Sequence, residues 1–167
     1  MLSAATGDSA SRRPDSDRRG PETDSRPLSQ VQAKEMLDAH NSWRSQYGVP
    51  PLAWSPKLAG YAQQWANTLL QRKRLEHRSN SSYGENLATA MGQRFTPQQV
   101  VDMWGSESRD YDQASNSCSH GKVCGHFTQV VWRDTMQVGC GVARDEQREV
   151  WVCNYYPPGN VIGYRPY

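Results

Sequence analysis

The sequence lacks a long apolar run, a large net charge and several short catalytic motifs. No stretch of the 167 residues holds enough consecutive apolar side chains to cross a bilayer. Nineteen basic and seventeen acidic residues leave a formal net charge of +2, which argues against the dense basic face of a nucleic-acid-binding domain. HExxH, GxSxG and CxxC are absent. These absences disfavour a helical zinc-protease site, a hydrolase nucleophile elbow and a thioredoxin or zinc-finger site.

Cysteine is also scarce, with four residues that all lie in the last third of the chain. An even count without CxxC spacing favours disulfides, and four reduced, buried thiols are the alternative. Four cysteines allow three pairings, of which local spacing favours Cys118 with Cys124 and Cys140 with Cys153. Disulfides persist outside the reducing cytosol, so we expect a secreted, extracellular protein. The first residues hold no apolar signal-peptide core, and we therefore expect the numbered chain to begin after processing.

Residues 1–27 differ in composition from the rest of the chain. This stretch has no apolar periodicity, and it mixes arginine and acidic residues in equal numbers with proline and glycine. It cannot bury enough surface to offset the entropy lost on ordering. The sequence therefore predicts a disordered tail over residues 1–27 and a single folded domain over residues 28–167.

Three helix start signals follow the tail. Ser29 precedes an apolar helical stripe that ends at Tyr47. Ser-Pro at 55–56 and Thr-Pro at 96–97 place proline at the first helical position, where its missing N–H does no harm. Each is followed by an apolar stripe with helical spacing. His40 lies on the first stripe, and its periodic position indicates packing.

Strand patterns dominate the last third of the folded region. Residues 136–143 and 149–155 look like two strands, and the polar turn between them predicts an antiparallel hairpin. A further short helix or strand is expected around Phe127–Trp132. Helices followed by strands with short links indicate an α+β fold rather than a parallel βαβ sheet.

Four ionisable residues are candidates for chemistry: His77, Glu85, Glu107 and His126. They are spread over about fifty positions, so local spacing does not group them. From spacing alone, each histidine is more often a satisfied structural group than a ligand.

Five motifs, taken in order, resemble the CAP superfamily, which groups cysteine-rich secretory proteins, antigen 5 and pathogenesis-related proteins. They are HNSWR (40–44), YGENLA (83–88), MWGSE (103–107), GHFTQVVW (125–132) and CNYYPPGNVIGYRPY (153–167). The last motif is most similar to the plant pathogenesis-related type one branch. This resemblance covers almost the whole folded region. It implies an α+β fold in the form of a three-layer α-β-α sandwich with a small antiparallel sheet.

The resemblance also implies a cleft lined by two histidines and two glutamates, which here are His77, Glu85, Glu107 and His126. Neutral imidazoles and carboxylates suit zinc or another divalent cation. We expect His77 and His126 to be direct ligands, with Glu85 and Glu107 orienting the rings or binding through water. The alternative is a hydrogen-bond and ion-pair network that only holds the cleft together.

For function, the resemblance implies a secreted, monomeric defence or antimicrobial protein that binds a sterol or a fatty-acid-like lipid and disturbs target-cell membranes. A sterol needs a mostly apolar groove. The segment LATAMGQRF (87–95) offers Met91 and Phe95 for one wall, and an ordinary surface loop is the alternative.

Two other functions stay open. A metal-dependent hydrolase would use Glu85 or Glu107 as general base, but we favour a function without catalysis. A signalling precursor would release the C-terminal segment Pro157–Tyr167, which holds no cysteine. The alternative for this segment is that it packs on the domain.

Two features of the surface carry further expectations. Plant-type relatives carry six cysteines in three disulfides, and the missing pair aligns with Lys73 and Asp145, so we expect a surface salt bridge between these two residues. Asn80 begins the triplet Asn-Ser-Ser, which makes it a candidate N-glycosylation site, although such triplets also occur by chance.

Overall fold

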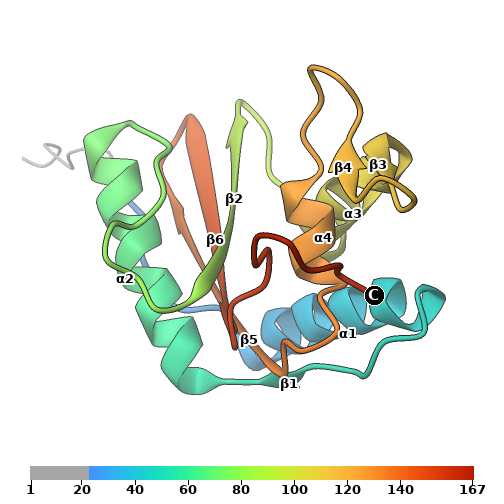
Figure 1. Cartoon of the computed structure of the whole chain (residues 1–167). Coiled ribbons are helices and arrows are strands. Elements are labelled where there is room, and N and C mark those ends of the chain that lie inside the picture. The colour runs from blue at the N-terminus through green and yellow to red at the C-terminus, as the bar shows by residue number, and fades with distance from the viewer. Residues whose placement is uncertain (1–22) are drawn as a thin grey trace, which may run out of the picture.

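A four-stranded sheet runs through the middle of the protein in the computed structural model, which describes residues 23–167 (Figure 1). In chain order the elements are α1 (Gln30–Gln46), β1 (Ala53–Trp54), α2 (Pro56–Arg72), β2 (Gly84–Met91), α3 (Pro97–Gly105), the 3-10 helix η1 (Ser106–Asp110), β3 (Tyr111–Asp112), β4 (Ser117–Cys118), α4 (Gly125–Val130), β5 (Gln137–Arg144) and β6 (Arg148–Tyr156). The first 22 residues, which make up most of the expected tail, lie outside the described residues. The domain boundary at residue 28 stays a prediction.

The main sheet has the strand order β1-β5-β6-β2. The expected hairpin is present, because β5 pairs antiparallel with β6 in a register that places Cys140 opposite Cys153. Strand β2 adds to the other edge of β6 along its whole length, and the short β1 runs parallel to β5. A second, two-stranded antiparallel sheet joins β3 and β4.

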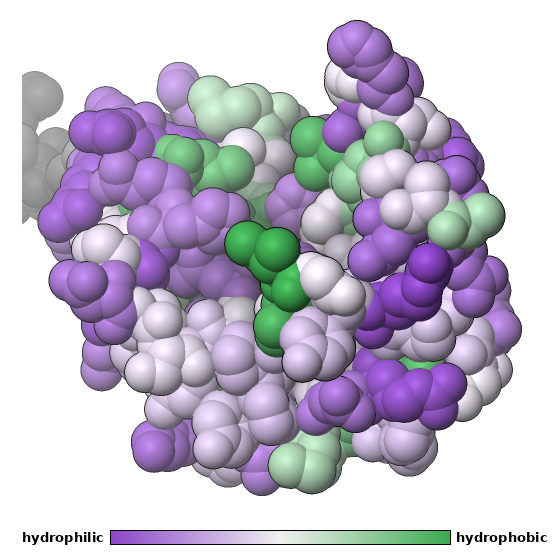
Figure 2. Space-filling view, in the orientation of Figure 1, coloured by the Kyte–Doolittle hydropathy of each residue, from purple (hydrophilic) through white to green (hydrophobic). Residues whose placement is uncertain are grey.

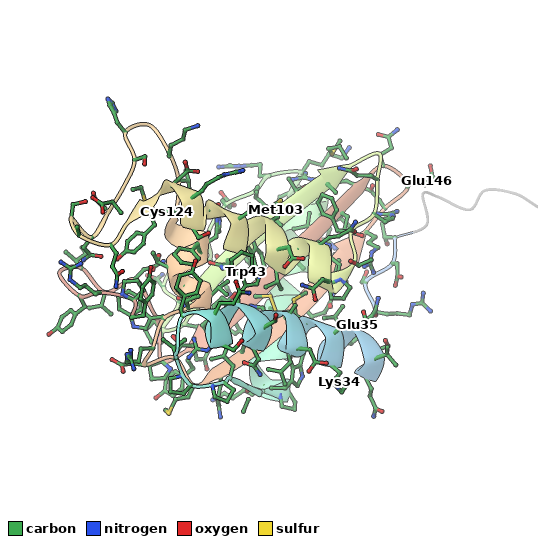
Figure 3. All side chains as sticks on the ribbon, turned by 90° about the vertical axis from the view of Figure 1, so that its right-hand side faces the viewer. Lys34, Glu35, Trp43, Met103, Cys124 and Glu146 are labelled. Atoms are coloured by element: carbon green, nitrogen blue, oxygen red, sulfur yellow. A yellow bond between two sulfur atoms is a disulfide. The ribbon has the colours of Figure 1, made fainter. Side chains whose placement is uncertain are left out.

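Helices cover both faces of the main sheet. Helix α2 packs on one face against β5 and β6, whereas α1, α3 and α4 form the layer on the other side (Figure 1). Within that layer α1 lies against α3, where the Trp43 indole N–H donates to the Asp102 carboxylate at 2.8 Å (Figure 3). Each helical layer buries its own apolar cluster against the sheet. The predicted α+β fold, a three-layer α-β-α sandwich, is thus confirmed.

The three predicted helix start signals act as N-caps. The Ser29 and Thr96 hydroxyls accept a hydrogen bond from the backbone N–H three residues on. The glutamine side chain at that position accepts one from the backbone N–H of the cap residue, so both form capping boxes. Ser55 caps α2 in the same way with one bond from the Leu58 N–H. These local bonds satisfy N–H groups that would otherwise lack a partner.

Glycine lets α2 approach the sheet closely. A Cβ atom at Gly141 in β5 would lie 2.5 Å from the Gln63 backbone nitrogen, and one at Gly139 would collide with the backbone around Ala59. Gln63 then reaches across this contact, because its amide donates to the Val142 carbonyl at 2.7 Å and accepts from the Val142 N–H at 3.1 Å. Of the helices described, none is both long and apolar enough to cross a membrane.

Candidate functional site

His126 and Glu107 form the first half of the site. His126 lies in the first turn of α4, and its Nδ1 is 2.7 Å from the Glu107 Oε1 atom. The second carboxylate oxygen of Glu107 accepts the backbone N–H of His126 at 3.1 Å. Because residue 124 supplies no side-chain cap, Glu107 also satisfies the start of α4. With Nδ1 donating to the carboxylate, Nε2 keeps the lone pair that a ligand would meet.

His77 and Glu85 form the second half in the same manner. Glu85 lies at the start of β2, and its Oε1 atom is 2.8 Å from the His77 Nδ1. The same oxygen accepts the Arg78 backbone N–H at 3.1 Å. The histidine side chain is 68% exposed, whereas the glutamate side chain is only 6% exposed. The other oxygen, Glu85 Oε2, is buried without a hydrogen-bond partner.

Asn86 joins the two halves. It follows Glu85 in β2, and its side-chain amide donates to the His126 carbonyl at 3.0 Å. The Trp104 ring stacks on the His126 imidazole, with an interplanar angle of 18°. In the part of the chain that the structure describes, no three His, Cys, Asp or Glu side chains gather into a ready metal-binding group. The four candidate residues therefore form two separate His–Glu pairs.

Asn86 is also the first member of a buried hydrogen-bond chain. The second proton of its amide points to the Tyr155 hydroxyl at 3.2 Å, and that hydroxyl is 2.9 Å from His40 Nε2. His40 Nδ1 is 2.7 Å from the Met36 carbonyl, which requires a donor at Nδ1 and leaves Nε2 to accept from Tyr155. Burial lowers the pKa of His40 to about 4, so the ring is neutral. His40 is buried as expected, whereas the roles of Asn86 and Tyr155 had no signal in their local sequence.

The disulfides fix the segments that flank the site. Cys118 bonds to Cys124, which links β4 to the residue just before α4. Cys140 bonds to Cys153 across the β5–β6 pair. Figure 3 shows Cys124 where the loop after β4 enters α4. The first bond therefore holds the loop that delivers His126.

The segment expected to form a lipid-binding loop is mostly strand. Residues 87–91 belong to β2, and only 92–96 connect it to α3. Met91 is 63% exposed, whereas Phe95 packs partly buried against the core. The buried Glu149 carboxylate holds this connection, because it accepts the Phe95 N–H at 3.0 Å and an ion pair from Arg144 at 2.6 Å. The segment is thus anchored rather than flexible.

The two surface expectations differ in outcome. Asn80 is exposed in a turn with φ of +56°, so an attached glycan would meet no packed layer. No ion pair joins Lys73 to Asp145 among the described residues, and that expectation is wrong. The Asp145 carboxylate instead accepts the N–H groups of Gln147 and Arg148 in the hairpin turn. These bonds, with a smaller contribution from the Lys73 charge, lower the pKa of Asp145.

Comparison with known proteins agrees with the motifs. The model of the CAP, or cysteine-rich secretory protein, family matches residues 37–155. The chain is 47% identical to pathogenesis-related protein 1B of Nicotiana tabacum, over 80% of each chain. It is 43% identical to a PR-1-type protein of Sambucus nigra, over 84% of each chain.

Solved structures show the same fold at lower identity. The crystal structure of NaASP2 with Zn2+ superposes with a TM-score of 0.68 at 20% identity, and covers 84% of this chain and 87% of its own. MpPR-1i gives a TM-score of 0.60 at 23% identity, over 81% of this chain and 94% of its own. Together with the motifs and the sandwich, these matches show that the chain belongs to the CAP family and is a PR-1-type domain.

Proposed function

We propose that this PR-1-type domain acts outside the cell and binds a sterol or another lipid. We also propose that it holds a divalent cation such as zinc at His77 and His126, each of which is paired with a glutamate. The observation that carries the cation is the repeated geometry of the site. In each half a carboxylate Oε1 atom lies within hydrogen-bonding distance of an imidazole Nδ1 atom, at 2.8 Å for His77 and 2.7 Å for His126. This arrangement fixes the tautomer of a metal-ligating histidine. The two disulfides suit an oxidising, extracellular compartment.

The residue types suit such an ion, and among the described residues they form two pairs rather than a ready group of three ligands. His77 and His126 would bind the ion through Nε2, and Glu107 would hold the His126 ring in place. The buried Glu85 Oε2 atom, which has no hydrogen-bond partner, is an oxygen that a cation or its bound water would satisfy. A bound zinc ion would supply a Lewis acid. The chain's own groups would bind the ion and orient the two imidazole rings, and no observation favours a catalytic step over binding.

Calorimetric titration with zinc tests the cation site. The wild-type protein is compared with the double variant His77→Ala/His126→Ala, and with His120→Ala as the matched control, because His120 lies exposed in the loop after β4. We expect zinc binding in the wild type and the control and its loss in the double variant. Equal binding by all three proteins, or by none, would leave the His–Glu pairs as a structural network.

The lipid has two candidate places. Met91 and Phe95 remain the sequence-based choice, of which Met91 is the more accessible. A cavity of about 320 Å³ at the starts of α1 and α2 is the alternative, and its lining is mostly apolar: Pro27, Leu28, Gln30, Ala33, Trp54, Pro56, Ala59, Gly60 and Cys140. Such a lining is what an apolar ligand requires.

A sterol-binding assay on three proteins separates these places. Met91→Asp puts a charge on the strand end, whereas Ala33→Asp puts one into the cavity lining. The latter lies in the first turns of α1, where the helix dipole tolerates an acid. Loss of binding in one variant alone identifies the place. Binding that survives both changes would exclude both, and a wild type without affinity would refute the lipid proposal itself.

A further inference from the structure

The C-terminal tail, residues 157–167, is bonded to the domain on both sides of a short turn. Before the turn, the Asn160 amide donates to the Gly125 carbonyl at 2.8 Å. After the turn, the Pro166 carbonyl accepts the Arg133 N–H at 2.7 Å. The tail is therefore fixed at both ends, and the turn between them is held in one place.

The turn itself presents apolar side chains to solvent. The Tyr164 N–H donates to the Val161 carbonyl at 3.1 Å and closes the turn, with Gly163 at φ of +86°. Ile162 is 97% exposed, Tyr164 69% and Val161 46%. We call Val161, Ile162 and Tyr164 the tail tip. Figure 2 shows a compact hydrophobic patch at the centre of its face, over the C-terminal tail of Figure 1.

The polar groups around the tail tip are already used within the protein. The tip borders a cavity of about 400 Å³ that is also lined by Asn116 and by the Cys118–Cys124 disulfide. The Asn116 amide donates to the Tyr164 carbonyl at 3.0 Å and accepts from the Tyr111 hydroxyl at 2.8 Å. A partner at this surface would therefore meet mainly apolar groups.

A cation adjoins this apolar surface. Arg165 directly follows the tail tip and is exposed. It forms no ion pair with a carboxylate among the described residues. The Arg165 guanidinium donates to the backbone carbonyls of residues 113 and 114. Its charge is also attracted to the Asp112 carboxylate. The surface thus combines exposed apolar side chains with a cation and a tyrosine.

We propose that the tail tip docks this protein on an anionic lipid bilayer, with Ile162 in the interfacial region and Arg165 over the lipid phosphates. Apolar side chains beside cations, with an amphipathic tyrosine, are the composition that binds such surfaces. A three-residue tip is small for a stable protein interface, which buries about 800 Å² on each partner. Because it is held at both ends, the tip needs little ordering on binding.

Vesicle sedimentation tests this proposal directly. The full chain is mixed with vesicles of phosphatidylcholine and phosphatidylserine that contain no sterol, and with vesicles of phosphatidylcholine alone. We expect binding to the anionic vesicles, which high salt weakens. Ile162→Asp should lower the partition coefficient at least about tenfold, since it replaces an apolar side chain that would enter the bilayer with a charge that the anionic surface repels. Val31→Asp is the matched control, because Val31 is 67% exposed on α1.

Several outcomes would overturn the proposal. These are a wild type that binds no vesicle, an Ile162→Asp variant that binds as well as the wild type, and a Val31→Asp variant that loses binding to the same extent. Self-association of the wild type without lipid, abolished by Ile162→Asp, would assign the tail tip to a second copy instead. The vesicles hold no sterol and no metal, so this result and those for the cleft and the sterol stay independent.

Discussion

Arg44 is fully buried, and its guanidinium bonds to backbone carbonyls rather than to a carboxylate. The acceptors within 3.0 Å are the carbonyls of Pro50, Val130, Trp132 and Thr135. Burial lowers the pKa of Arg44 to about 10, which still leaves it charged at neutral pH. This side chain therefore holds the segment between α4 and β5, because it donates to the carbonyls of Val130, Trp132 and Thr135.

Replacing Arg44 should cost much of the protein's stability. Arg44→Met keeps the apolar stem but removes the guanidinium donors to four carbonyls, of which that of Trp132 still accepts the Thr135 N–H. We expect a loss of about 3 kcal/mol or more in the free energy of unfolding, measured with urea. Arg133→Met, at an exposed position, should change it by less than about 0.5 kcal/mol. Similar small losses in both variants would contradict this role.

His40 should make stability depend on pH. Its pKa falls from 6.5 to about 4 on folding because the ring is desolvated, so between these pH values the unfolded chain binds more protons than the native one. Stability should therefore decrease as the pH falls from 6.5 to 4, by about 3 kcal/mol, and change no further from this source below pH 4.

The variant His40→Gln tests this dependence. Glutamine does not titrate, so its curve of unfolding free energy against pH should be flatter than the wild-type curve between pH 4 and 6.5. Its absolute stability will also fall, because the bond to Tyr155 is disturbed, but that loss is separate from the slope. Parallel curves for the two proteins would show that another group dominates this range.

Among the elements, those with local signals could be predicted and β2 could not. Ser29 and Thr96 mark the starts of their helices, because each side chain forms a capping hydrogen bond with a backbone N–H only three residues away. Strand β2 reads GENLATAM, which has no clean alternation, and what makes it a strand is its pairing along the far edge of β6. The motifs indicated the two histidines and the two glutamates but not which glutamate pairs with which histidine. They also gave no sign of the bond between Asn86 and Tyr155, because it joins two different motifs and spans 69 residues.

The contact between α2 and β5 depends on glycine. Gly141→Ala would put a Cβ 2.5 Å from the Gln63 backbone, and a helix backbone cannot move aside as a side chain can. We expect a loss of about 1–3 kcal/mol in unfolding free energy. Gly60→Ala is the matched control, because it lies in the interior of α2 and the added Cβ would meet no atom outside its own stretch of helix within 4 Å. It should stabilise the protein by roughly 0.5–1 kcal/mol. A neutral Gly141→Ala would mean that the layers separate easily.

In the whole molecule, the two disulfides belong to regions of different stability. Cys140 and Cys153 are at most 1% exposed, and their bond crosses the central strands between the two helical layers. Cys118 is exposed and lies at the rim with the small β3–β4 sheet. Local openings occur at such rims with low free energies, whereas central strands open only when the whole domain unfolds.

Partial reduction should therefore open the two bonds in order. Thiol–disulfide exchange requires access to a sulfur, so a mild reductant followed by alkylation and mass spectrometry should label Cys118 and Cys124 first, in otherwise native protein. Cys140 and Cys153 should be labelled only at the rate of global unfolding, and a denaturing concentration of urea should abolish the difference. Simultaneous labelling of all four cysteines without denaturant would show that the rim and the central sheet open as one cooperative unit. In the expected order, loss of the first bond frees the loop that delivers His126, so reduction should weaken zinc binding before it unfolds the domain.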